Sequence, residues 1–183
     1  MKDEPDEEIK MILLGESGVG KTSIIERYLN DKLNADYFPS TTMNYAEKDI
    51  EINKKIIRLN IWDTIGQEKY RAISNLFLNE TKIVILVYSI DDSNSFKELE
   101  FWNNLAKKQI DENVFLGIVG NKSDLFLDQK VSELEGKNYA QKNNAIFAQL
   151  SAKDNRLGIV DYINKLVSEY FENENHNKNK KNK

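Results

Sequence analysis

The segment GESGVGKT, residues 15–22, has the residue types and spacing of a phosphate-binding loop. Its glycines let the backbone curl so that N–H groups converge on phosphate oxygens, and a helix that starts near Lys21 adds its positive end. Lys21 supplies a mobile ammonium for the β- and γ-phosphates and is a candidate catalytic residue, while the Thr22 hydroxyl is a candidate Mg²⁺ ligand. The segment therefore predicts a nucleoside triphosphate site. Its candidate phosphate-binding residues are Glu16, Ser17, Gly18, Val19, Gly20, Lys21, Thr22 and Ser23.

Two later motifs indicate which base is bound. In NKSD, residues 121–124, the Asp124 carboxylate can accept hydrogen bonds from N1–H and the 2-amino group of guanine, whereas adenine offers no matching donors. In SAK, residues 151–153, the backbone N–H of Ala152 can meet the guanine carbonyl oxygen. Each motif alone is also compatible with a polar turn, so the order and spacing after the phosphate loop favour the guanine site. Its candidate residues here are Asn121, Lys122, Asp124, Ser151, Ala152 and Lys153.

Short apolar runs alternate with amphipathic stretches along the chain. Strands are predicted at 9–14, 45–52, 56–62, 83–88, 114–119 and 145–149, and helices after residue 21, over 96–110 and over 160–170. Two further pairs, Ser95 with Glu98 and Ser132 with Glu135, predict capping boxes at helix starts. Strands that alternate with helices predict an α/β fold, with a mainly parallel sheet covered on both faces and one antiparallel hairpin.

The composition sets the broad class of the protein. With 183 residues, no cysteine and a net charge of −4, the chain suits one cytoplasmic, monomeric domain without disulfides, and nucleic acid is not expected as a partner. The expected organisation is a flexible acidic extension over 1–8, one domain over 9–172 and a disordered polar and basic tail over 173–183. No apolar run is long enough to span a bilayer.

The segments WDTIGQEKYR, VYSIDDSNSF and GNKSDL together resemble the Ras superfamily of small GTPases, most closely its Rab branch. The resemblance covers residues 9–171. It implies a three-layer P-loop NTPase fold with a six-stranded sheet and about five helices, and a GTP/GDP switch that hydrolyses GTP slowly in vesicle trafficking. It also implies effector, exchange-factor and GTPase-activating partners, which would contact two switch segments at 33–44 and 65–78.

The resemblance assigns roles to further positions. Asp63 would hold Mg²⁺ through water, Gly66 would offer its N–H to the γ-phosphate, and Gln67 would be the catalytic residue that orients the attacking water. A hydroxyl in the first switch segment would contact the metal. Counting without gaps from the phosphate loop favours Ser40 slightly over Thr41 for that contact.

The sequence departs from the family pattern in three places. Leu33 stands where an aromatic residue usually covers the guanine, and Ile65 stands where a small alanine is usual. A branched side chain at 65 could crowd the second switch segment, so a nucleotide-binding interaction module with impaired hydrolysis is the alternative function. A C-terminal cysteine for lipid attachment is missing, which implies either a shortened tail or indirect membrane contact. An ATP-using kinase is disfavoured by Asp124.

Overall fold

A computed structural model describes residues 4–30, 44–64, 78–111 and 114–181 of the chain. Several residues singled out in the sequence lie outside these ranges, as do most of the two predicted switch segments. They are Leu33, Ser40, Thr41, Ile65, Gly66 and Gln67.

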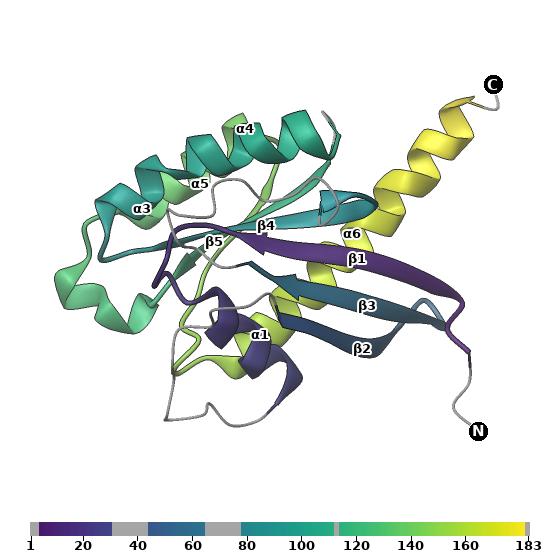
Figure 1. The fold of residues 1–183 in the computed structure, drawn as a ribbon, viewed down its shortest axis with the longest axis horizontal. Helices are drawn as coiled ribbons and strands as arrows, with labels where there is room; N and C mark the ends of the chain where they lie inside the picture. Colours follow the sequence, from purple (N-terminus) through teal and green to yellow (C-terminus); the bar gives the residue numbers. More distant parts are fainter. Residues whose placement is uncertain (1–3, 31–43, 65–77, 112–113, 182–183) are drawn as a thin grey trace.

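The described strands form one sheet in the order β2-β3-β1-β4-β5-β6 (Figure 1). β2 and β3 pair antiparallel and every other neighbouring pair is parallel, which confirms the predicted mainly parallel sheet with one hairpin. The strands are β1 (Glu7–Leu14), β2 (Asn44–Ile52), β3 (Lys55–Asp63), β4 (Thr81–Ser89), β5 (Phe115–Asn121) and β6 (Ile146–Gln149).

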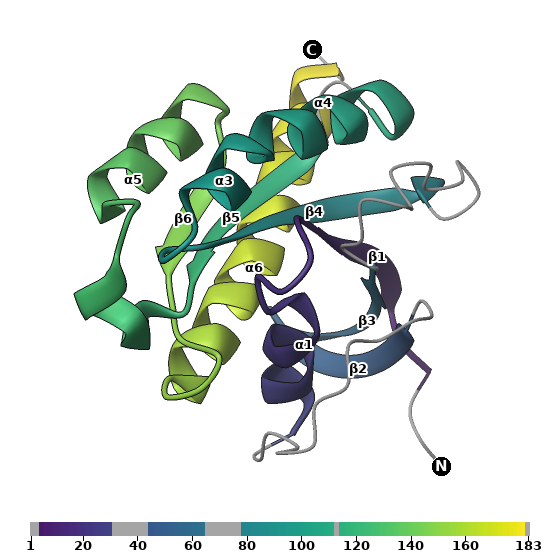
Figure 2. The ribbon, with the colours of Figure 1, turned by 60° about the vertical axis from the view of Figure 1, so that its left-hand side comes forward.

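Helices cover both faces of the sheet, so the fold has the three predicted layers. α1 and α6 lie on one face, whereas α3, α4 and α5 lie on the other (Figures 1 and 2). The described helices are α1 (Lys21–Leu29), α3 (Ser93–Lys97), α4 (Leu99–Gln109), α5 (Glu133–Lys142) and α6 (Arg156–Lys181), with a short 3₁₀ helix, η2 (Ser123–Asp128).

Alternating side chains of the central strands fill two hydrophobic cores. In β1, Met11 and Leu13 pack toward α1 and α6, while Ile12 and Leu14 pack toward α4 and α5. All four are at most 1% exposed. Successive side chains of a strand point to opposite faces, so a continuous apolar run is what a strand buried on both faces requires. This packing fixes the ends of the strands, where the predicted site lies.

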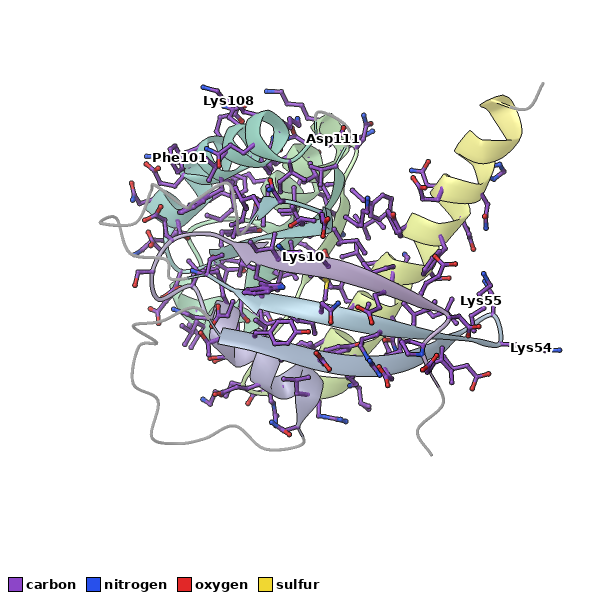
Figure 3. The ribbon with its side chains drawn as sticks, turned by 45° about the vertical axis from the view of Figure 1, so that its right-hand side comes forward. Lys10, Lys54, Lys55, Phe101, Lys108 and Asp111 are labelled. Atoms are coloured by element: carbon purple, nitrogen blue, oxygen red, sulfur yellow. The ribbon has the colours of Figure 1, made fainter. Side chains whose placement is uncertain are left out.

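The hairpin between β2 and β3 turns on two residues, Asn53 and Lys54, both with positive φ. Tight hairpins favour such turns because their twist matches that of the paired strands. Lys55, which lies between the strands predicted at 45–52 and 56–62, already belongs to β3. Figure 3 shows Lys54 and Lys55 at the outer tip of the hairpin.

One of the two predicted capping boxes is present. At α5, the Ser132 hydroxyl accepts the Glu135 N–H while the Ser132 N–H donates to the Glu135 carboxylate. The prediction at Ser95 was wrong, because the Asp92 side chain caps α3 by accepting the Asn94 N–H at 2.9 Å. The buried Ser95 hydroxyl instead accepts the Ser89 N–H at 3.0 Å, which ties α3 to the end of β4.

The structure differs from the expected boundaries at both ends of the domain. β1 begins at Glu7, which pairs in register with Ile57, so the strand includes the last residues of the predicted acidic extension. The backbone of the predicted tail is helical as far as Lys181, because α6 continues through it. Adding residues to an existing helix is far easier than starting one, so the helix continues although four of residues 172–181 are asparagines, which are weak helix formers. Within the described residues, no helix is both long and apolar enough to cross a membrane.

Candidate nucleotide-binding site

The phosphate loop, residues 15–22, connects β1 to α1 and lies against the ends of β4 and β5. A Cβ on Gly15 would come within 2.2 Å of the Val87 carbonyl oxygen, and one on Gly20 within 2.3 Å of Asn121 Nδ2. Gly20 also has a φ of 95°, in the left-handed region that favours glycine. These glycines are therefore required for the loop to follow its path beside the two strands.

Lys21 is buried and folds back across this loop. Its Nζ donates to the carbonyl oxygens of Gly15 and Glu16, at 2.8 Å each. Burial lowers the pKa of Lys21 to about 8, although the negative charges of Asp63 and Glu16 oppose the shift. The ammonium thus lies beside the first two residues of the loop, whose carbonyl oxygens it binds.

Thr22 and Asp63 bring two oxygen groups together beside the loop. The Thr22 hydroxyl, in the first turn of α1, donates a hydrogen bond to Asp63 Oδ2 at the end of β3. Mg²⁺ prefers oxygen ligands and is usually bound by one or two protein side chains, with water and phosphate oxygens completing its shell. Across the ranges that the structure describes, no group of three or more histidine, cysteine, aspartate or glutamate side chains could hold a metal by itself. The pair therefore fits Mg²⁺ bound together with a nucleotide.

The rest of the phosphate loop divides into exposed and anchored parts. Ser17 and Gly18 are exposed at its tip, whereas Val19 is 1% exposed and packs in the core. The Glu16 carboxylate accepts a hydrogen bond at 3.1 Å from the indole N–H of the buried Trp102 on α4. The loop is thus tied to the helical layer above it.

Asn121 joins the phosphate loop to the guanine loop, which we define as residues 151–153. It ends β5, is 1% exposed, and donates through Nδ2 to the Val19 carbonyl at 2.8 Å. Its Oδ1 accepts the Ala152 N–H at 3.1 Å. In this structure, therefore, the N–H expected to meet the guanine carbonyl oxygen is held by Asn121.

Asp124 lies at the start of η2 and is positioned by the guanine loop. The Ser151 hydroxyl donates to Asp124 Oδ1 at 2.5 Å and accepts the Asp154 N–H at 3.0 Å. Lys122, with a φ of 65°, turns the chain from β5 into η2 and is partly exposed. The side chain of Lys153 is exposed. The two motifs, far apart in the sequence, thus form one polar corner at the carboxyl edge of the sheet.

The comparisons with known proteins decide the family. The Ras family model matches residues 10–172. The chain belongs to the Ras family of small GTPases. Its similar relatives include Ras-related protein Rab-11B of Dictyostelium discoideum, 36% identical over 145 residues, which are 79% of this chain and 66% of that protein. Ras-related protein SEC4 of Candida albicans is 34% identical over 80% of this chain and 70% of its own length. Ras-related protein Rab-21 of Geodia cydonium is 36% identical over 89% and 71%.

Family membership explains why the described part of the site has these residues. Ras-family proteins bind guanine nucleotides and are GTPases, and open α/β sheets bind ligands at the carboxyl ends of their strands. In this Ras-family chain the phosphate loop follows β1, Asp63 ends β3 and Asn121 ends β5. All three therefore lie at the same edge of the sheet.

Two side chains at this site were not found from the sequence. Arg27, on α1, donates to the backbone carbonyls of Ala152 and Lys153, and Trp102 contacts Glu16. Their partners lie 125, 126 and 86 residues away along the chain. Both residues fit the apolar and polar pattern of an ordinary amphipathic helix, so no local signal distinguished them.

Proposed function

We propose that this Ras-family chain is a Mg²⁺-dependent switch that binds GTP, hydrolyses it slowly and changes shape between its GTP and GDP forms. The observation that carries the proposal is the pair of hydrogen bonds made by Asn121, whose side-chain amide contacts both the phosphate loop and the guanine loop. We infer that one ligand contacts both loops, with its phosphates at the first loop and its guanine base at the second. Asp124 selects the base, because its carboxylate matches the two donors of guanine.

The described residues have distinct parts in hydrolysis. Backbone N–H groups of the phosphate loop and the Lys21 ammonium hold the phosphates, and Thr22 and Asp63 would hold Mg²⁺. When bound, Mg²⁺ supplies positive charge against the phosphate oxygens. A water oxygen forms the new bond to the γ-phosphorus, the bond to the GDP oxygen breaks, and phosphate leaves. By family resemblance, Gln67 orients that water and Gly66 contacts the γ-phosphate.

Replacing Gln67 should remove hydrolysis but leave GTP binding. We expect Gln67→Leu to lower the rate of single-turnover hydrolysis by about tenfold or more, because the water loses the group that orients it, while GTP affinity stays within about threefold. The measurement is conversion of pre-loaded GTP to GDP with Mg²⁺. Equal rates in the two proteins would remove Gln67 from the mechanism. Tight GTP binding without conversion in either protein would leave two explanations: complete dependence on an activating protein, or the alternative function, an interaction module silenced near Ile65.

Replacing Thr22 should separate GTP binding from GDP binding. Thr22→Asn removes the hydroxyl that faces Asp63, so we expect GTP affinity in Mg²⁺ to fall about tenfold more than GDP affinity. Thr22→Ser, which keeps the hydroxyl, is the matched control and should bind both nucleotides nearly as the parent does. Equal losses of GTP and GDP affinity in Thr22→Asn would argue against Thr22 as a metal ligand.

An aromatic hollow on the sheet supports the proposed partner surface. The rings of Tyr45 and Trp62 are in contact, with centroids 4.9 Å apart and planes tilted by 54°, and Tyr45 is 47% exposed. They line a hollow of about 670 Å³ together with Lys10, which Figure 3 labels beside β1. Tyr45 follows the first predicted switch segment and Trp62 precedes the second. Effectors and regulators that read the nucleotide state would contact this surface.

The cellular role is proposed from the relatives. They are named as Rab and SEC4 proteins, and the resemblance to the Rab branch implies a role in vesicle trafficking. We therefore propose that this chain acts in vesicle trafficking as a peripheral protein of endomembranes.

A further inference from the structure

We propose that Arg27 is a positioning residue for base recognition, which holds the guanine loop against α1 so that guanine is preferred over other bases. The proposal rests on the proposed function, because it assumes that the guanine loop binds a base. Arg27 itself lies in the last turn of α1, at the far end of that helix from the phosphate loop.

The Arg27 guanidinium binds two consecutive backbone carbonyls. Nε donates to the Ala152 oxygen at 2.9 Å, and Nη2 donates to the Lys153 oxygen at 2.8 Å. Hydrogen bonds from a charged donor are stronger than neutral ones, and the rigid planar fork of arginine suits two acceptors held side by side. The contact therefore fixes both the position and the orientation of this part of the guanine loop.

Ala152 is held from two directions at once. Its carbonyl is bound by Arg27, and its N–H is bound by Asn121, whose other amide atom binds the Val19 carbonyl. Because the phosphate loop continues directly into α1, these contacts form a closed circuit from the phosphate loop through Asn121, the guanine loop and Arg27 back to α1. Ser151 in the same loop positions Asp124. Removing the Arg27 guanidinium would therefore loosen the guanine loop, while the hydrogen bonds of Lys21 within the phosphate loop would remain.

A second arginine nearby provides a control, because it distinguishes positioning of the guanine loop from docking of α1. Arg156, at the start of α6, donates to the Asn30 carbonyl at 3.3 Å, just after α1. Both arginines thus join α1 to the region around α6, but the carbonyls of the guanine loop accept hydrogen bonds from Arg27. If Arg27 acted only by docking α1, removing Arg156 should also weaken nucleotide binding.

The test compares the parent protein with Arg27→Met, Arg27→Lys and the control Arg156→Met. Affinities for GDP and ADP are measured in excess Mg²⁺, by competition against a fluorescent GDP, with thermal unfolding of each variant recorded. We expect Arg27→Met to bind GDP about tenfold to a hundredfold more weakly, the range for losing hydrogen bonds to a charged group, and to bind ADP as the parent does. Arg27→Lys should fall in between, because an ammonium lacks the fork. Arg156→Met should match the parent.

Three results would overturn the proposal. GDP affinity of Arg27→Met equal to that of the parent would show that the loop keeps its position without the guanidinium. Equal losses for GDP and ADP would show a general loss of structure, and an equal loss in Arg156→Met would show helix docking alone. If the parent itself did not prefer GDP to ADP, the proposed function would fail before the role of Arg27 was tested.

Discussion

Asp124→Asn should change the preferred base from guanine to xanthine. The asparagine oxygen can still accept N1–H, but its amide N–H₂ faces the guanine 2-amino group, donor against donor. Xanthine has a carbonyl oxygen at that position and accepts the same N–H₂. Losing a charged hydrogen bond and leaving a donor unpaired together cost about 3–5 kcal/mol, which is roughly a hundredfold to several thousandfold in affinity. We therefore expect GDP binding to fall by that factor and xanthosine diphosphate binding to rise.

Competition of GDP and xanthosine diphosphate against a fluorescent nucleotide measures this exchange. Asp128→Asn is the matched control, because it makes the same change at the exposed end of η2 and should leave the GDP preference as in the parent. Asp124→Asn that keeps the full GDP preference would contradict the assignment of Asp124 to the base. The Ser151 hydroxyl that holds this carboxylate can also bond an amide oxygen, so the loop itself should persist.

Gly20→Ala should destabilise the protein and break the link between the two halves of the site. A Cβ there would lie 2.3 Å from Asn121 Nδ2, and the backbone φ of 95° is costly for any residue with a side chain. Moving the Asn121 amide would weaken its bonds to Val19 and Ala152. We expect the free energy of unfolding without nucleotide to fall by about 2–4 kcal/mol.

Gly18→Ala provides the control for backbone strain. Gly18 also has a positive φ, 76°, but its Cβ would meet no heavy atom within 4 Å. Urea unfolding in the absence of nucleotide should therefore show a loss of about 1–2 kcal/mol for Gly18→Ala, which is smaller than the loss for Gly20→Ala. Equal losses in the two variants would mean that the approach of Gly20 to Asn121 does not constrain the loop.

The sheet could be predicted because burial on both faces leaves a strong pattern. The runs that became β4 and β5 are continuously apolar, and each is bounded by polar or turn residues. Capping was harder to predict. Ser95 has the spacing of a capping box, but the N-cap of α3 is Asp92, three residues earlier. The Ser95 hydroxyl instead accepts a hydrogen bond from the Ser89 N–H at the end of β4. Competition of this kind depends on where the helix docks, which the local sequence does not show.

The location of the site could be predicted for a similar reason. Motifs that follow parallel strands meet at one edge of a sheet, so the strands predicted at 9–14, 56–62 and 114–119 place the phosphate loop, Asp63 and Asn121 together. Contacts from helix surfaces could not be predicted. Arg27 reaches the guanine loop and Trp102 reaches Glu16 only after helices and sheet have packed. The bond between the Ala152 N–H and Asn121 likewise depends on the packed distance between two loops.

Relative affinity of the unmodified protein for GDP and ADP, in Mg²⁺, tests most directly whether the phosphate and guanine loops form one site. Both nucleotides present the same phosphates, so the difference between them comes from the base. The proposed site predicts binding of GDP about a hundredfold or more tighter than binding of ADP, because adenine leaves the Asp124 carboxylate without its donors. Equal affinities would contradict the account, since the phosphate loop would then act without the corner formed by Asn121, Asp124 and the guanine loop.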